Sequence, residues 1–319
     1  MKHPQQDKPT VLITGASGFV GSNLIRLLHR DFRLVGLGRE SVASPESFPP
    51  ADAVIHLAGL AHDTEGAADE QAYREVNVEL TRRIFDLFLA SDAKTFIFFS
   101  SVQAVASELP AGAALTEGHI PHPRSVYGRS KLEAEDYLLQ PRSDYPGKRI
   151  LILRPAMIHG PQNKGNLNLL YQMLQRNVPW PLALMQREMP WPLAAFNNQR
   201  SFAGIDNVAF AVKGLLEKPV PSGIYNLADD EPISTNELVS LITESLGRQP
   251  RYWKVPKWMV RLLARVGDVL PLPLNSHRLR KLTESYVVSN ENLKRALGVE
   301  RMPVSAVDGL TQALQSFRE

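Results

Sequence analysis

A tyrosine and a lysine four residues apart form the pair in this sequence best suited to moving a proton. Tyr127 and Lys131 lie in residues 124–140, whose pattern predicts a helix, so both side chains face the same way. A phenol has an ordinary pKa of about 10, and a neighbouring ammonium stabilises the phenolate. Lowering that pKa to about 7 takes roughly 4 kcal/mol. We predict a proton-exchanging tyrosine tuned by Lys131; the alternative is an ordinary pair on a helix surface.

Two serines follow an apolar stretch, residues 95–99, that predicts a buried strand. Ser100 and Ser101 therefore stand at the carboxyl end of a strand, where parallel α/β sheets place their ligands. A hydroxyl at that place can hold a substrate carbonyl beside the tyrosine. The alternative is that these serines only form a turn.

Three glycines lie between the first predicted strand, residues 10–14, and the helix predicted at residues 18–29. The segment 14–21 has the sequence TGASGFVG, with Gly15, Gly18 and Gly21 in the spacing G-x-x-G-x-x-G. Glycine permits a tight turn and close approach of the backbone to a pyrophosphate, which the helix N-terminus attracts. The segment predicts a dinucleotide site, although three glycines can also make a tight junction alone.

The end of the second predicted strand, residues 33–37, indicates which dinucleotide binds. A carboxylate there would accept from the ribose 2′-hydroxyl and favour NAD. This chain has Gly38 and Arg39 instead, and a guanidinium suits a 2′-phosphate. We therefore expect NADP(H) in preference to NAD(H). The neighbouring Glu40 keeps open the alternative that Arg39 is a solvated surface residue.

The elements that position these residues alternate between strands and helices. Such alternation, with strongly apolar strands, predicts a doubly wound parallel sheet covered on both faces, a Rossmann-type α/β fold. Beyond Pro155 the pattern becomes mainly helical, with strands again at residues 201–203 and 223–227 that return to the sheet. We predict a dinucleotide-binding domain at 1–160 with returning segments near 197–230, and a substrate-binding region at 161–196 and 231–319. The first half is expected to hold strands at 10–14, 33–37, 53–57, 95–100 and 149–153, and helices at 18–29, 69–90 and 124–140.

Composition excludes several classes of function. The chain of 319 residues has no cysteine and a net charge of +3, which argues against disulfides, thiolate metal sites and nucleic-acid binding. We expect no membrane span and, from an N-terminus without an apolar core, a cytoplasmic protein. His119 and His122 flank a proline, so no metal site is expected, and no G-x-S-x-G elbow supports a hydrolase. His56 and His159 are expected in the core or at strand ends.

Two further segments are unusual. The sequence PWPLA occurs at 179–183 and again at 190–194, which indicates either a flap over the substrate pocket or a local duplication in a surface loop. Residues 258–270 are amphipathic and carry Arg261, Arg265 and Asp268. We expect this second segment to pack on the domain rather than to contact a membrane.

Taken together these motifs resemble the extended short-chain dehydrogenase/reductase family, the NAD-dependent epimerases and dehydratases that modify nucleotide sugars. The resemblance runs from residue 10 to about residue 226 and more loosely beyond. AVIHLAG at 53–59 is similar to the strand lining the adenine and ribose side. FFSSVQAV at 98–105 is similar to the catalytic-serine strand, which favours Ser101 over Ser100. The family's asparagine helix is similar to EVNVELTRRIF, and its catalytic pair is similar to SVYGRSK. The segment after the next strand resembles LRPAMIHGPQNKGN, and the diphosphate-binding strand resembles QRSFAGIDN.

The resemblance implies a role for individual residues. It makes Ser101, Tyr127 and Lys131 catalytic. It implies substrate contacts by Ser101, Gln103, Tyr127, Asn166, Arg200 and Arg278, with Arg200 at the diphosphate. It implies dinucleotide contacts by Gly15, Ser17, Gly18, Phe19, Val20, Gly21, Arg39, Leu57, Ala58, Gly59, Asn77, Ser100, Tyr127, Lys131 and Pro155.

Departures from the family pattern narrow the reaction. Family dehydratases carry an Asp-Glu pair where this chain has Val102 and Gln103, so the acid and base for eliminating water are missing. The Pro-Trp-Pro-Leu stretch followed by Asn-x-Arg-Ser-Phe is similar to bacterial reductases of UDP-4-keto-6-deoxy-N-acetylhexosamines in surface polysaccharide synthesis. We predict that reaction. The alternatives are a UDP-hexose or UDP-N-acetylhexosamine 4-epimerase with tightly held NAD, and a non-catalytic dinucleotide sensor. The two long helices allow a homodimer but do not establish one.

Overall fold

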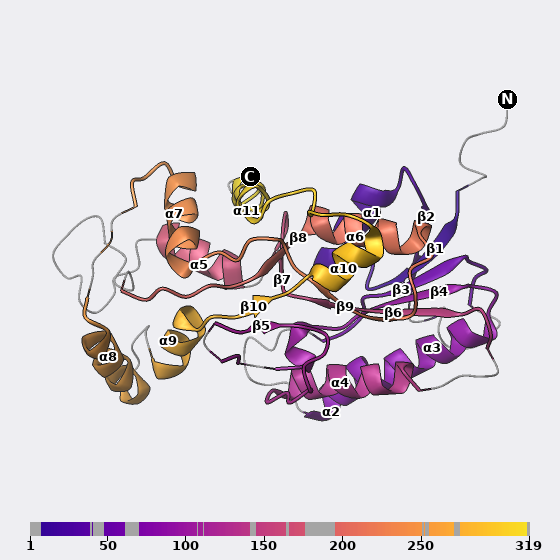
Figure 1. Cartoon of the computed structure of the whole chain (residues 1–319), viewed down its shortest axis with the longest axis horizontal. Helices are drawn as coiled ribbons and strands as arrows, with labels where there is room; N and C mark the ends of the chain where they lie inside the picture. The colour runs from indigo at the N-terminus through magenta and orange to yellow at the C-terminus, as the bar shows by residue number, and fades with distance from the viewer. Residues whose placement is uncertain are drawn as a thin grey trace.

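A parallel sheet lies at the centre of the dinucleotide-binding half. The computed structural model describes residues 8–38, 40, 48–60, 70–106, 108–110, 112–140, 145–163, 166–175, 195–250, 252, 255–270 and 275–317. Within these residues six strands pair in the order β2-β1-β3-β4-β6-β9, every pair parallel. This confirms the expected doubly wound fold (Figure 1). The strands are β1 (Thr10–Thr14), β2 (Arg33–Leu37), β3 (Ala53–His56), β4 (Thr95–Phe99), β6 (Arg149–Pro155) and β9 (Gly223–Leu227).

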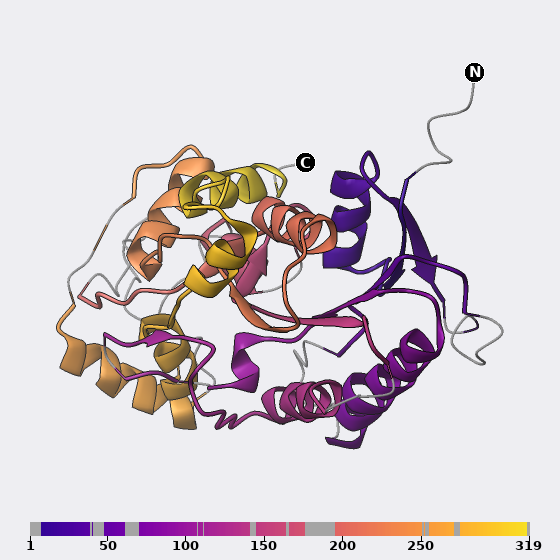
Figure 2. The ribbon, with the colours of Figure 1, turned by 45° about the vertical axis from the view of Figure 1, so that its right-hand side comes forward.

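Helices cover both faces of this sheet because successive strand residues point to opposite sides. In β1, Ile13 packs with helices α1 (Phe19–Leu28), α6 (Ile205–Glu217) and α10 (Glu291–Leu297), whereas Leu12 packs with α3 (Leu80–Ala90) and α4 (Val126–Leu138). Figure 2 shows these two helical layers on either side of the strands. Burying each large apolar side chain contributes about 1.5–3 kcal/mol, so the two layers hold the sheet rigid beneath the site.

The helix expected at 69–90 is interrupted. It consists of α2 (Glu70–Tyr73), a π-helical turn (Arg74–Glu79) and α3. Such a turn adds one residue to the helix and commonly marks a functional position. Here it contains Asn77, whose side chain bonds to the loop after β3, as described below.

The second half of the chain forms a smaller, mainly helical layer with two short parallel pairs. The strand expected at 201–203 corresponds to β8 (Phe202–Gly204), but it pairs with β7 (Met157–His159) instead of rejoining the six-stranded sheet. That part of the prediction was wrong because pairing partners depend on long-range packing. Among the described strands that follow β6, β9 alone returns to the main sheet. The remaining elements are β5 (Ala114–Leu115), which pairs with β10 (Val287–Val288), and helices α5 (Asn166–Gln175), α7 (Thr235–Ser245), α8 (Lys257–Val269), α9 (Ser276–Thr283) and α11 (Ala306–Gln315).

Several expectations lie outside the described residues. They are the PWPLA repeat at 179–183 and 190–194, most of the crossover between β2 and β3, Arg39, and the side chains of Asn166 and Arg278. None of the helices in the described ranges combines the length and apolar character needed to cross a bilayer.

Candidate active site

The glycine segment forms a cradle at the carboxyl end of β1. Gly15 has a φ of +68°, and a Cβ built on it would lie 2.9 Å from the backbone nitrogen of Ala58. A Cβ on Gly21 would lie 2.3 Å from the carbonyl oxygen of Gly15. Gly18, the N-cap of α1, makes no side-chain cap, and together with Ser17 it is exposed. The N-terminal N–H groups of α1 therefore face open space, which fits the pyrophosphate of a dinucleotide.

Ser101 and Tyr127 meet at the carboxyl end of β4. Ser101 caps a 3-10 turn (Val102–Ala104), and its hydroxyl accepts from the backbone N–H of Gln103 at 3.2 Å. Ser125 caps α4 by accepting from the N–H of Gly128 at 3.0 Å. These two caps bring the Tyr127 hydroxyl into a side-chain hydrogen bond with Ser101. The predicted partnership of the second serine with the tyrosine is present in the fold.

Gly128 is a residue that the sequence reasoning missed. A Cβ at this position would lie 2.4 Å from the carbonyl oxygen of Gln103, so only glycine lets the first turn of α4 approach the serine loop. The signal was available: a glycine directly after the tyrosine, inside a predicted helix, has a cost of about 1 kcal/mol relative to alanine and calls for a packing reason.

Burial has the largest effect on the acidity of Tyr127. Burial raises the pKa of Tyr127 to about 12; the hydrogen bond with Ser101 opposes the shift, and the nearby Tyr73 adds to it. The expected lowering of the Tyr127 pKa by Lys131 is therefore wrong. The ammonium of Lys131 instead donates to the carbonyl of Phe99 at 2.9 Å and lies 4.8 Å from the centre of the Phe98 ring. A protonated phenol is the form that can donate a proton.

Lys131 is buried, and burial lowers its pKa to about 8, although the Glu135 carboxylate opposes the shift. A Cβ on Gly59 would lie 3.1 Å from the Lys131 nitrogen and 3.0 Å from the side-chain oxygen of Asn77. The exposed Gly59 backbone thus covers both polar groups at the end of the β3 segment.

Asn77 ties three segments together. Its amide oxygen accepts from the N–H of Leu60 at 2.7 Å, and its amide nitrogen donates to the carbonyl of Leu60 at 3.1 Å and to the hydroxyl of Ser130 at 2.9 Å. The loop after β3, the π-helical turn and α4 are therefore fixed relative to one another. Asn77 orients the segment that carries Tyr127 and Lys131 rather than pointing freely into the site.

His56, at the end of β3, belongs to a chain of buried hydrogen bonds beneath this loop. The Thr81 hydroxyl donates to the carbonyl of Asn77 at 2.7 Å, so its oxygen accepts from Nε2 of His56 at 2.9 Å. Nδ1 must then accept from the Thr14 hydroxyl at 2.6 Å, and the Thr14 oxygen accepts from the N–H of Ala58 at 3.1 Å. Burial, reinforced by the charge of Lys131, lowers the pKa of His56 to about 3. The imidazole is neutral, and its core position matches the expectation, as does that of the buried His159.

The first serine has a different partner. The Ser100 hydroxyl donates to the carboxylate of Glu135. Glu135 also forms a buried ion pair with Arg154, in which the Arg154 Nε donates to the same carboxylate at 2.9 Å. Pro155, at the end of β6, is buried next to this pair in the chain. Sequence reasoning missed Glu135 and Arg154, although a glutamate one turn beyond Lys131 on the same helix face was a visible signal.

Arg200 lies apart from the serine loop but is connected to it. Its backbone bonds with Ile233 at 3.0 and 2.9 Å, and burial lowers the pKa of its half-buried guanidinium, against the opposing effect of Glu284. Tyr286, which adjoins Arg200 through an isolated bridge, donates its hydroxyl to the carbonyl of Ala106 at 2.7 Å. Gln103 is exposed beside Ser101. Tyr286 thus links the backbone of Arg200 to the loop that follows Ser101.

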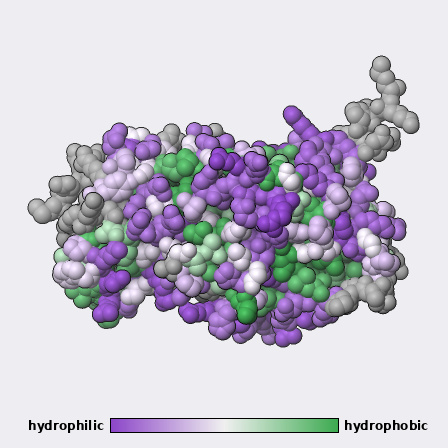
Figure 3. Space-filling view, in the orientation of Figure 1, coloured by the Kyte–Doolittle hydropathy of each residue, from purple (hydrophilic) through white to green (hydrophobic). Residues whose placement is uncertain are grey.

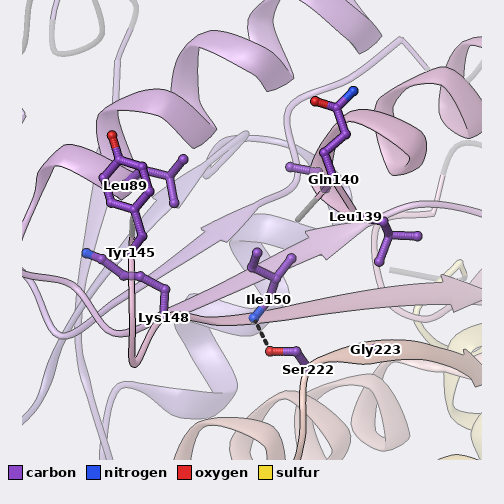
Figure 4. Close-up of a pocket in the computed structure, with 9 residues that line it drawn as sticks. Leu89, Leu139, Gln140, Tyr145, Lys148, Ile150, Ser222 and Gly223 are labelled. Carbon is purple, nitrogen blue, oxygen red and sulfur yellow. Dashed lines mark hydrogen bonds between the residues drawn. The ribbon is translucent and has the colours of Figure 1, made fainter. Parts of the chain in front are cut away.

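A pocket of about 250 Å³ lies elsewhere, by the amino ends of β6 and β9 (Figure 4). Its one cation, Lys148, donates to the carbonyls of Phe88, Ser91 and Ala93 at 3.1, 2.6 and 2.7 Å and so closes the C-terminus of α3. Ligands of doubly wound sheets bind at the carboxyl ends of the strands. We therefore locate the site at the opposite edge from this pocket.

The family model for the NAD dependent epimerase/dehydratase family matches residues 11–228. The chain belongs to this family. It is an enzyme of the extended short-chain dehydrogenase/reductase type with a nicotinamide dinucleotide cofactor, as the sequence predicted. The glycine cradle and the uncapped start of α1 fit such a cofactor.

Individual relatives cover most of the chain. It is 26% identical to the UDP-glucose 4-epimerase of Vibrio cholerae, over 97% of this chain and 95% of the relative. It is 28% identical to the N-acetyl-alpha-D-glucosaminyl-diphospho-ditrans,octacis-undecaprenol 4-epimerase of Escherichia coli O157:H7, over 89% and 84%. It is also 28% identical to the GDP-6-deoxy-D-mannose reductase of Pseudomonas aeruginosa, over 73% and 79%.

Solved structures share the fold. MoeE5 in complex with UDP-glucuronic acid and NAD superposes with a TM-score of 0.72 at 20% identity, covering 97% of this chain and 99% of that one. RMD from Pseudomonas aeruginosa complexed with NADPH gives 0.70 at 23% identity, covering 97% and 98%. The fold therefore accommodates either dinucleotide in other proteins.

Proposed function

We propose that this protein reduces the C4 ketone of a UDP-linked 6-deoxy-N-acetylhexosamine, a precursor of surface polysaccharide, with NADPH. The observation that carries the proposal is the hydrogen bond between Tyr127 and Ser101 at the same edge of the sheet as the glycine cradle. A ketone reduction needs a hydride and a proton, and the tyrosine is positioned to give the proton. The named activities of the relatives, sugar epimerases and a sugar reductase, support a nucleotide sugar as substrate.

In this mechanism each residue has one role. NADPH, when bound, supplies the hydride that adds to C4. Tyr127 donates its hydroxyl proton to the former carbonyl oxygen, so that the ketone becomes an alcohol and the phenol becomes a phenolate. Ser101 donates a hydrogen bond to the same oxygen, where negative charge develops. Lys131 stabilises the phenolate and contributes a donor to the ribose, and Asn77 fixes the helix that carries both residues.

We propose that the dinucleotide is held by the cradle of Gly15, Ser17, Gly18 and Gly21, with Phe19 and Val20 at the start of α1. Leu57, Ala58 and Gly59 line it from the end of the β3 segment. Arg39 follows β2 and is the proposed partner of the 2′-phosphate, which favours NADP(H) over NAD(H). Because the Ser100 hydroxyl already donates to Glu135, we assign Ser100 a supporting place rather than a direct contact.

The experiment supplies purified protein with NADPH and a UDP-4-keto-6-deoxy-N-acetylhexosamine. We expect loss of NADPH absorbance and a product with a new C4 hydroxyl. Arg39→Ala should raise the KM for NADPH much more than the KM for NADH, because only the 2′-phosphate loses a partner. Arg83→Ala, which removes an exposed arginine on α3, is the matched control.

The second candidate is a 4-epimerase, and two relatives named as 4-epimerases, which match 97% and 89% of this chain, favour it. An epimerase regenerates its dinucleotide in every cycle and gains from never releasing it. The purified protein would then carry tightly bound NAD and interconvert UDP-N-acetylglucosamine and UDP-N-acetylgalactosamine without added cofactor. That result, with no NADPH consumption, would replace the reductase proposal. A protein that binds NADPH but accelerates neither reaction would support the remaining alternative, a sensor.

A further inference from the structure

Helix α8 presents an apolar surface that the proposed reaction does not use. Trp258, Leu262 and Val266 follow one another at intervals of four residues, and Val269 lies in the same stripe; Trp258 is 64% and Val269 86% exposed. With Leu270, which follows the helix, they are five of the ten exposed large hydrophobic residues in the part of the chain that the structure describes. Large apolar side chains gathered on one exposed face mark an interaction surface.

The opposite face of the same helix is the one that packs on the domain. Val260 and Ala264 are buried against Val255 and Leu279, and Gly267 is buried in the same row. The expectation that this segment packs on the domain is thus correct for one face only. A helix needs a single apolar stripe to join a core. The second stripe lies on the solvent side and belongs to none of the core clusters formed by the described residues.

Positive charge borders this second stripe. Arg261 and Arg265 form the neighbouring row, one helical turn apart, and Lys257 stands at the start of the helix; all three are exposed. The one acidic residue of the helix, Asp268, is occupied: its carboxylate accepts from the Ser276 hydroxyl at 2.6 Å and from the Ser276 N–H at 2.8 Å. Figure 3 shows apolar and hydrophilic side chains side by side at the end of the molecule that holds α8.

We propose that α8 docks the protein on an anionic lipid surface. A helix that lies in the plane of a membrane interface buries tryptophan, leucine and valine in the boundary layer while lysine and arginine meet the lipid phosphates. The stripe and the cationic row of α8 match this chemistry. Figures 1 and 2 both place α8 at the periphery, away from the six-stranded sheet.

A second copy of the chain is a less suitable occupant. A two-fold contact presents the same patch from both subunits, so the cations beside the stripe would be doubled within one interface. Like charges brought together in an interface cost several kcal/mol. Lipid phosphates compensate this charge instead.

Docking at α8 would also hold the site in a defined orientation. Asp268 of α8 bonds to Ser276 at the start of α9, and Arg280 of α9 bonds to Glu108, just beyond the serine loop, at 2.9 Å. The docked helix is therefore connected to the catalytic edge through two polar links. This proposal concerns a surface and does not rest on the proposed reduction.

Co-sedimentation of the full chain with vesicles tests the proposal. We expect binding to vesicles of equal parts phosphatidylcholine and phosphatidylglycerol, weak binding to phosphatidylcholine alone, and release by salt. Leu262→Ser combined with Val266→Ser should weaken binding on the order of tenfold or more. Arg261→Gln and Arg265→Gln should each weaken it about fivefold.

Matched controls keep the result specific. Val307→Ser removes an exposed apolar residue of α11, and Arg83→Gln removes an exposed cation of α3; neither should change binding. All variants should keep the wild-type melting temperature and turnover. The proposal is overturned if wild-type protein ignores the anionic vesicles or if the serine variant binds as well as wild type. It is also overturned if that variant instead turns a stable dimer into a monomer.

Discussion

The hydroxyls of Ser100 and Ser101, neighbours in the chain, bond to different helical residues of α4. Ser101 bonds with Tyr127 near the start of the helix, and Ser100 donates to the buried Glu135 two turns further on. The side chains of successive residues in an extended segment point in opposite directions, which separates the two roles. One serine faces the proposed substrate position and the other holds α4 against the sheet.

This relationship predicts different phenotypes for the two serines. Ser101→Ala should lower kcat strongly, and Tyr127→Phe should lower it by about a hundredfold or more, the scale of losing a general acid. NADPH binding should survive in both. Ser100→Ala should instead lower the free energy of unfolding by about 1 kcal/mol, through a lost hydrogen bond, with a small change in kcat. Steady-state kinetics and denaturant unfolding measure the two effects; a larger loss of kcat in Ser100→Ala would reverse the assignment.

The placement of Tyr127 and Lys131 on one helix could be predicted from the sequence because their spacing is local. A helix places residues four apart on one face, and strand ends are recognisable from apolar runs. The dinucleotide loop was predictable for the same reason. The π-helical turn at Asn77 was not, because it depends on bonds to Leu60 and Ser130 from segments distant in sequence.

Two other predictions, the pKa of Tyr127 and the pairing of β8, were wrong for the same physical reason. The pKa of Tyr127 depends on burial by the whole fold, whereas the sequence showed only the nearby lysine. The strand β8 was recognised, but its partner β7 depends on how the two halves of the chain pack. Local pattern identifies an element, and long-range contacts decide its neighbours.

The ion pair of Glu135 and Arg154 predicts a large coupling in stability. Both side chains are almost fully buried, so removing one leaves an uncompensated charge. Glu135→Leu should lower the free energy of unfolding by about 3 to 5 kcal/mol. Combining it with Arg154→Leu should recover much of that loss, since both opposite charges of the pair are then removed together. Urea unfolding of both singles and the double variant measures the coupling; simple additivity would contradict it.

His56 predicts loss of stability in acid. Its folded pKa is about 3, against an ordinary value of 6.5, so between these values the unfolded chain binds a proton that the folded chain does not. The stability is fully present above pH 6.5 and falls as the pH drops towards 3. His56→Gln, which cannot be protonated, should flatten this part of the curve, and His122→Gln, at an exposed position, should not. Equal acid sensitivity in His56→Gln and wild type would refute the assignment.

The lowered pKa of Lys131 predicts a change of stability at alkaline pH. Its folded pKa is about 8, below the ordinary 10.5, so between these values the unfolded lysine holds a proton that the folded one has lost. Stability should therefore rise with pH from 8 to about 9, below the range around pH 10 in which Tyr127 titrates in the unfolded chain. Lys131→Met should remove the rise, and Lys94→Met, at an exposed lysine, should leave it. Thermal melts across this range provide the measurement.

Arg200 predicts a separation of binding from chemistry. A guanidinium matches two phosphate oxygens at once, and its half-buried position strengthens that attraction relative to open water. Arg200→Leu should therefore raise the KM for the nucleotide sugar much more than it lowers kcat, since the diphosphate is remote from C4. Arg200→Lys keeps the charge but loses the two-pronged contact and should fall between the two. Arg280→Gln, which removes an exposed arginine of α9 paired with Glu108, controls for loss of positive charge nearby. Calorimetric titration with UDP separates the possibilities: unchanged affinity in Arg200→Leu would remove this residue from the diphosphate site while leaving the roles proposed for Ser101, Tyr127 and Lys131 intact.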